Sequence, residues 1–161
     1  RLAWVAKAQG ATRGLRYDPD MGAVAKLSCS SSGLAWLATL SDEAALELVA
    51  EQGFGNVEEF GPHAPTTVTA LLEALRETRT RGFSLTVETF APGMNAIAAP
   101  VKRGDQAALG TLSIAGPSIR FTEERMLALG DELLNVADEL AASTSASSLL
   151  RAGRPTTASP L

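Results

Sequence analysis

The stretch from Met94 to Ala115 reads MNAIAAPVKRGDQAALGTLSIA and decides the fold class. Its two ends, Met94 to Val101 and Ala107 to Ala115, are rich in small and β-branched residues, which predicts two strands. The Arg103-Gly104-Asp105 segment between them is typical of a hairpin turn. Strands joined by a hairpin run antiparallel, so the stretch predicts an antiparallel sheet and not a doubly wound parallel one.

Further strands are predicted on the N-terminal side of this hairpin. Phe83 to Val87 alternates between apolar and polar residues, as a strand with one buried face does. Leu2 to Lys7 and Thr12 to Tyr17 look like a strand pair around Gln9-Gly10.

Four helices complete the predicted order of elements. A serine-capped helix includes Leu34 to Ala38, and Ser41 caps a second helix over Asp42 to Gln52. Helical spacing of leucines predicts a third helix over Thr67 to Thr80, and a single last helix begins at Thr122. Helices gathered on an antiparallel sheet make an α+β fold.

Composition bounds the class of protein. The 161 residues suit one domain, here 1–142, followed by a weakly ordered tail over 143–161 that is rich in Ser, Thr, Ala and Pro. A net charge of -4 argues against a nucleic-acid-binding surface on this chain. One cysteine allows no internal disulfide, and no apolar run approaches the roughly 20 residues that span a bilayer, so we expect a cytoplasmic protein without membrane contact. The chain starts directly on a predicted strand, which suggests a domain cut from a longer protein.

The residues available for catalysis are few. Cys29 and His63 are the only cysteine and histidine, and no third residue with a recognisable spacing would orient them as a nucleophile and base. They are also too few for a zinc site. We therefore expect no enzyme, no metal and no cofactor, and an enzyme using Cys29 is kept only as an alternative.

Three segments suit a binding site better. Ser28-Cys29-Ser30-Ser31-Ser32-Gly33 precedes an apolar helix, where hydroxyls and free N–H groups favour an anion, although one serine would suffice as a cap. Ala91 to Pro100 is a small-residue strand in which Asn95 can donate and accept hydrogen bonds, although tight helix packing also favours alanines. In Gly110 to Pro117, Ser113 and Ala115 share one strand face.

Taken together, the chain resembles the effector-binding domain of IclR-type transcriptional regulators, from about Leu2 to Ala142. The resemblance is carried by the order and spacing of several short motifs, which are Ser32-Gly33-Leu34-Ala35-Trp36-Leu37-Ala38, Arg81-Gly82-Phe83-Ser84, Glu88, Gly93, Ala98-Ala99-Pro100 and Ser113-Ile114-Ala115-Gly116-Pro117.

The resemblance implies a GAF-like fold, in which helices flank a curved antiparallel sheet that carries an effector pocket. In the family, backbone amides at the positions of Ser30, Ser31 and Ser32 bind the carboxylate of a small organic acid. Further contacts and an apolar wall fall on the positions of Gly14, Tyr17, Ala25, Thr86, Met94, Ala96, Ser113 and Ala115. A winged helix-turn-helix, absent from this chain, binds DNA, and the regulators are homodimers or homotetramers.

The chain departs from members that bind glyoxylate. Those members carry an acid at the position of Thr86, a cysteine at Ala96 and a serine at Ala115. The smaller residues here predict a larger carboxylate, such as an aromatic acid, with Asn95 or Ser113 binding a polar substituent. A structural dimerisation module with a vestigial pocket is the alternative to a sensor.

Overall fold

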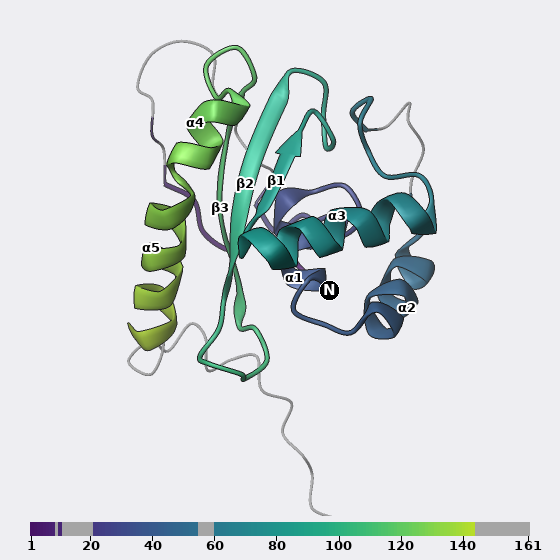
Figure 1. The fold of residues 1–161 in the computed structure, drawn as a ribbon, viewed down its shortest axis with the longest axis horizontal. Coiled ribbons are helices and arrows are strands. Elements are labelled where there is room, and N and C mark those ends of the chain that lie inside the picture. Colours follow the sequence, from purple (N-terminus) through teal and green to yellow (C-terminus); the bar gives the residue numbers. More distant parts are fainter. Residues whose placement is uncertain (9, 11–20, 55–59, 144–161) are drawn as a thin grey trace, which may run out of the picture.

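The computed structural model describes residues 1–8, 10, 21–54 and 60–143 of the chain. A sheet in the middle of the molecule has helices on two sides (Figure 1). In chain order the elements are α1 (Ser31–Leu37), α2 (Asp42–Gln52), α3 (Val68–Arg81), β1 (Ser84–Val87), β2 (Met94–Val101), β3 (Gly110–Pro117), α4 (Glu123–Ala128) and α5 (Gly130–Ser143). The predicted α+β class, with an antiparallel sheet flanked by helices, is confirmed.

The sheet has the order β1-β2-β3, and both pairs are antiparallel. β2 has the predicted bounds, whereas β3 begins at Gly110, later than predicted. The connection is longer than a tight turn, and Arg103 within it donates from Nε to the Ala141 carbonyl at 2.7 Å, which ties the loop to the end of α5. Pairing resumes only where the Leu109 N–H donates to the Val101 carbonyl at 2.8 Å.

The two faces of β2 have different surroundings. Ile97, Ala99 and Val101 point into an apolar core that Phe83, Met126 and Leu133 complete against α4 and α5. The alternate residues of β2 point toward α1, on the opposite face. A second apolar cluster lies among α1, α2 and α3 and contains Leu34, Val49, Leu71 and Leu75.

The serine caps predicted for the first two helices are confirmed, because the hydroxyls of Ser30 and Ser41 accept hydrogen bonds from N–H groups in the first turns of α1 and α2. Thr67, predicted as the first residue of the third helix, caps α3 in the same way. Gly82 ends α3 in the left-handed conformation with φ 86°, which a residue with a side chain rarely adopts.

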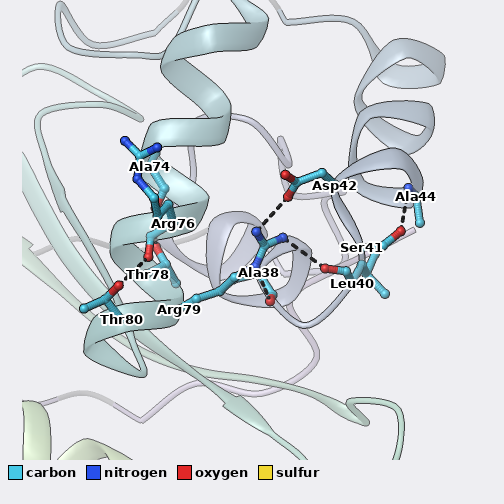
Figure 2. A network of polar contacts seen from close by, with 10 residues as sticks. All are labelled: Ala38, Leu40, Ser41, Asp42, Ala44, Ala74, Arg76, Thr78, Arg79 and Thr80. Carbon is cyan, nitrogen blue, oxygen red and sulfur yellow. Dashed lines mark hydrogen bonds and ion pairs between the residues drawn. The ribbon is translucent and has the colours of Figure 1, made fainter.

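Arg79 joins α3 to the connection between α1 and α2. Its guanidinium donates to the carbonyls of Ala38 at 3.1 Å and Leu40 at 3.0 Å, and pairs with the Asp42 carboxylate at 2.7 Å (Figure 2). This network fixes the C-terminal end of α1 and the start of α2 against α3.

The prediction of one long last helix is wrong, because the structure has α4 and α5 with Leu129 between them. Gly130 packs so closely on the Phe83 ring that a Cβ at this position would collide with the ring. The break lets the backbone approach the sheet there, while the apolar stripe that predicted the helix continues along both pieces.

The N-terminal segment also differs from its prediction. Leu2 to Lys7 forms no strand, and Ala3 pairs instead with Val24 in an isolated antiparallel bridge. The predicted partner, Thr12 to Tyr17, and the predicted tail from residue 144 lie outside the described residues. In the part that the structure describes, no helix is long and apolar enough to cross a membrane.

Candidate ligand-binding site

A pocket opens between the start of α1 and the sheet face that is turned away from α5. Its cavity volume is about 40 Å³, and the space around it widens to about 410 Å³ when the solvent at the open mouth is included. The lining residues are Trp4, Ser30, Ser31, Ser32, Thr86, Phe90, Met94, Asn95, Ala96, Ser113 and Ala115. The structure thus brings together nearly all of the residues that the sequence predicted for a binding site.

The serine-rich turn forms the polar end of the pocket. Ser30 caps α1: its Oγ accepts from the Gly33 N–H at 3.1 Å and donates to the Lys26 carbonyl at 2.6 Å. Ser31 and Ser32 are 5% and 6% exposed, and neither their N–H groups nor their hydroxyls have a hydrogen-bond partner among the described residues. Four donors are therefore available at the positive end of a helix.

Side chains on both sides of this turn hold its backbone. Gln52, at the end of α2, accepts from the Leu27 N–H at 2.8 Å and donates to the Ala25 carbonyl at 3.0 Å. Ser84 of β1 donates to the Ser31 carbonyl at 2.7 Å. Gly33 is needed here because a Cβ would collide with the Leu27 backbone. The sequence did not reveal Gln52 as a support, since glutamine at a helix end has no distinctive pattern.

The floor of the pocket consists of small side chains on three strands. Thr86, Ala96 and Ala115 are register partners across β1, β2 and β3, so their side chains point to the same face. The Thr86 hydroxyl donates to the Ala96 carbonyl at 3.0 Å and is not free for a ligand. Ser113, two residues before Ala115, is exposed, and its hydroxyl has no partner in the described part of the chain.

Asn95 lines the pocket, but its side chain already has partners. Its Nδ2 donates to the Phe121 carbonyl at 2.8 Å, and its Oδ1 accepts from the Glu88 N–H at 3.2 Å. Because Asn95 and Ala96 are adjacent in β2, their side chains point to opposite faces of the sheet. The amide therefore holds the β1–β2 turn and the start of α4, and this geometry argues against the predicted role in binding a substituent.

Two predicted residues do not line the described pocket. Ala25 is buried and its backbone pairs with Leu2 and Gln52, so it lies in the support of the serine-rich turn. Tyr17, like Gly14, lies outside the described residues.

The sequence prediction missed two aromatic walls. Trp4 comes from the N-terminal segment and Phe90 from the turn after β1, and their ring centroids lie 6.0 Å apart at an interplanar angle of 71°. Phe60 packs on the far side of Phe90 at 6.0 Å. Trp4 stood in the predicted first strand, but nothing in the sequence showed that the pocket lay beside it.

Among the described residues that line the pocket, none has a charged side chain. Cys29 belongs to the serine-rich turn but is fully buried, and this burial raises the pKa of its thiol to about 12 in spite of the opposing charge of Lys26. The thiol is therefore protonated near neutral pH and a poor nucleophile. The His63 ring is directed at the Val87 carbonyl, with Nδ1 3.0 Å from the oxygen. These observations argue against a Cys29–His63 catalytic pair.

Comparison with known proteins agrees with this geometry. Residues 1–142 match the family described as bacterial transcriptional regulator IclR C-terminal. The chain belongs to this family. The IclR-type effector domain expected from the sequence is thus confirmed, as is the fold that the resemblance implied.

The relatives with curated names are transcriptional regulators. The chain is 26% identical over 126 residues to the HTH-type transcriptional repressor AllR of Escherichia coli K12, covering 78% of this chain and 45% of AllR. It is 38% identical over 85 residues to the HTH-type transcriptional regulator BhcR of Paracoccus denitrificans, covering 52% of this chain and 30% of BhcR. The IclR-type domain therefore spans less than half the length of these relatives.

Solved structures share the fold. The IclR of Thermotoga maritima superposes with a TM-score of 0.68 at 20% identity, covering 83% of this chain and 52% of that one. A double mutant of the inducer-binding domain of PobR from Acinetobacter, in complex with 3-hydroxybenzoic acid, gives a TM-score of 0.66 at 24% identity, covering 75% of this chain and 70% of that one.

Proposed function

We propose that this IclR-type domain senses a small organic acid with an apolar, aromatic body, and that the acid controls DNA binding by the regulator. The observation that carries the proposal is the polarity of the pocket. Unpartnered donors of Ser31 and Ser32 lie at one end, and Trp4, Phe90 and Met94 supply apolar walls.

The polar end suits a carboxylate. Two backbone N–H groups and two hydroxyls at a helix start can share its oxygens, and the helix dipole favours the negative charge. A carboxylate bound by these four donors needs no buried arginine or lysine, and the described residues of the lining include neither. On the floor, the Ser113 hydroxyl can both donate to and accept from a substituent, because it has no partner among the described residues. The proton of the Thr86 hydroxyl is already donated to the Ala96 carbonyl, so Thr86 could only accept.

The aromatic body is supported by the walls and by a relative. Flat rings pack favourably against tryptophan and phenylalanine, edge to face or offset. The related PobR domain was solved with 3-hydroxybenzoic acid. We therefore expect benzoate-like acids to bind more tightly than two- or three-carbon acids.

The test is a calorimetric titration with benzoate, 3-hydroxybenzoate, pyruvate and glyoxylate. In Ala115→Leu, a larger side chain fills the floor of the pocket, and we expect affinity for the bound acid to fall by about tenfold or more, or 1.4 kcal/mol. Ala107→Leu is the matched control, since Ala107 is exposed in the β2–β3 connection and outside the pocket lining. It should bind as the unaltered protein does.

Two results would contradict the proposal. If no acid binds at millimolar concentration, the domain is better explained as a structural dimerisation module with a vestigial pocket. If only pyruvate or glyoxylate binds, the aromatic part of the proposal is wrong, although the sensor remains.

We extend this proposal to the full-length regulator. We place DNA binding in a helix-turn-helix segment outside these 161 residues, in a cytoplasmic homodimer or homotetramer. Sedimentation of the full-length regulator with and without the acid, together with a DNA-binding assay, tests this part. A monomer, or DNA affinity that no bound acid alters, would contradict it.

A further inference from the structure

Trp4, which forms one wall of the pocket, belongs to an N-terminal segment, residues 2–5, that has few contacts among the described residues. Ala3 and Val5, on either side of Trp4, are exposed. The backbone of the segment is held by hydrogen bonds to a short stretch of chain: Trp4 N–H to Ala23 O at 3.4 Å, Gly22 N–H to Trp4 O at 2.9 Å, and Ala25 N–H to Leu2 O at 2.7 Å. Among the described residues, the packing contacts of residues 2–5 are those of Leu2 with the helical cluster and of Trp4 with Phe90. A segment that belongs to no strand and has few such contacts opens at a lower cost than the paired sheet does.

The opposite aromatic wall is held firmly. Phe90 follows Thr89, whose hydroxyl donates to the Cys29 carbonyl at 2.5 Å and whose carbonyl accepts from the Gly61 N–H at 3.1 Å. The same turn is closed by Glu88, whose N–H donates to the Met94 carbonyl at 3.0 Å. The remaining walls belong to the sheet and to the buried start of α1, so they are fixed by pairing and packing.

The enclosed space is small for an aromatic acid. A water molecule needs about 10–15 Å³ of such space, so the enclosed volume of about 40 Å³ holds about three waters. A two- or three-carbon acid has a comparable number of heavy atoms, whereas benzoate has several more. A ring can therefore reach the depth of the pocket, beyond its open mouth, if one wall yields.

We propose that Trp4 is the movable wall: an aromatic acid displaces Trp4 from Phe90 and shifts the segment 2–5 with it, while a short acid leaves both in place. This inference rests on the proposed function and adds a mechanism by which the conformation of the N-terminal segment depends on the size of the bound acid. The ring of the acid replaces the Phe90 edge as the contact of Trp4, so the aromatic interaction is exchanged rather than lost. What changes is the set of backbone hydrogen bonds to residues 22–25.

Amide hydrogen exchange tests the proposal directly, with benzoate and glyoxylate as probes at saturating concentrations. With benzoate, the Gly22 amide should exchange about tenfold faster, because its acceptor is the Trp4 carbonyl. With glyoxylate it should not change. Amides within α3, which lies outside the pocket lining, serve as the internal control.

The variant Trp4→Ala separates movement from binding. It should bind benzoate more weakly, because one apolar wall is lost, while Ser31, Ser32 and Met94 still hold the acid. At saturating benzoate, exchange at Gly22 should no longer speed up. Trp4→Phe, a milder change, should show a reduced effect if Trp4→Ala does not fold. Trp36→Phe, which alters the tryptophan that packs against the helical cluster, should respond as the unaltered protein does.

Two outcomes would overturn the proposal. One is benzoate binding, seen by calorimetry, with unchanged amide exchange at Gly22. This result would be compatible with an acid sensor but would contradict the movement of Trp4. The other is benzoate-induced exchange at Gly22 that persists in Trp4→Ala. Failure of every acid to bind would instead remove the proposed function, and the movable wall with it.

Discussion

The two faces of β2 differ in what their side chains do. Ile97 is fully buried against α4 and α5, while its neighbour Ala96 lines a pocket under α1. One face therefore supplies stability and the other leaves room for a ligand. Because strand side chains alternate, successive residues of one strand can be assigned to the two tasks independently.

On the pocket face of the sheet, the buried hydroxyls of Ser84 and Thr86 are both paired. Ser84 and Thr86 donate to the carbonyls of Ser31 and Ala96 at 2.7 and 3.0 Å. Short hydroxyl side chains fit between α1 and the sheet, whereas larger apolar ones would fill the space. The comparison thus explains why this face is built from serine, threonine and alanine.

Truncation on the core face should have the largest effect. Ile97→Ala removes a fully buried side chain between the sheet and the last helices and should lower the free energy of unfolding by about 2–5 kcal/mol. Urea denaturation measures it. Wherever the variant remains folded, acid affinity should be unchanged, and a weakened affinity would contradict the separation of the two faces.

Gly33→Ala should damage the pocket face. The added Cβ collides with the Leu27 backbone, so we expect a loss of about 1–3 kcal/mol in stability and weaker acid binding together. Gly110→Ala is the control, because a Cβ on Gly110 meets no atom within 4 Å. If acid binding survives Gly33→Ala, the serine-rich turn is not the anchor.

A smaller effect is expected from the network that supports α1 from the side. Arg79→Lys loses the forked contacts to Ala38, Leu40 and Asp42 shown in Figure 2 and should cost about 1 kcal/mol, since the group is partly exposed. Arg76→Lys, on the same helix, is the control, because no hydrogen bond involves the Arg76 side chain in the described residues. Thermal unfolding of the two variants should differ.

The smallest effect at neutral pH concerns Cys29. Burial raises the pKa of its thiol from 9.0 to about 12, so the folded state retains a proton that the unfolded state loses between these values. Its contribution to stability is complete below pH 9 and declines as the pH rises toward 12. Alkylation by iodoacetamide at pH 8 should be far slower in the folded than in the urea-unfolded protein. Equal rates would show that the thiol is accessible.

Much of the site could be predicted because it follows local patterns. The serines before an apolar run predicted the cap of α1, and period-two alternation put Ser113 and Ala115 on one face. The roles of Asn95 and Ala25 could not be predicted in this way. Their side chains or backbones pair with Phe121 and Gln52, which are distant in the sequence.

The sequence by itself determined the α+β class, the bounds of β2, the helix caps and the set of small polar residues that face α1, because hydrogen bonding and periodicity along a strand or helix are local. Only the tertiary structure decided which aromatic residues close the pocket. The ring centroids of Trp4 and Phe90 lie 6.0 Å apart although the two residues are distant in the sequence, and no local sequence pattern predicts that contact. The same holds for the close approach at Gly130, where the ring of the distant Phe83 occupies the space that a side chain would need.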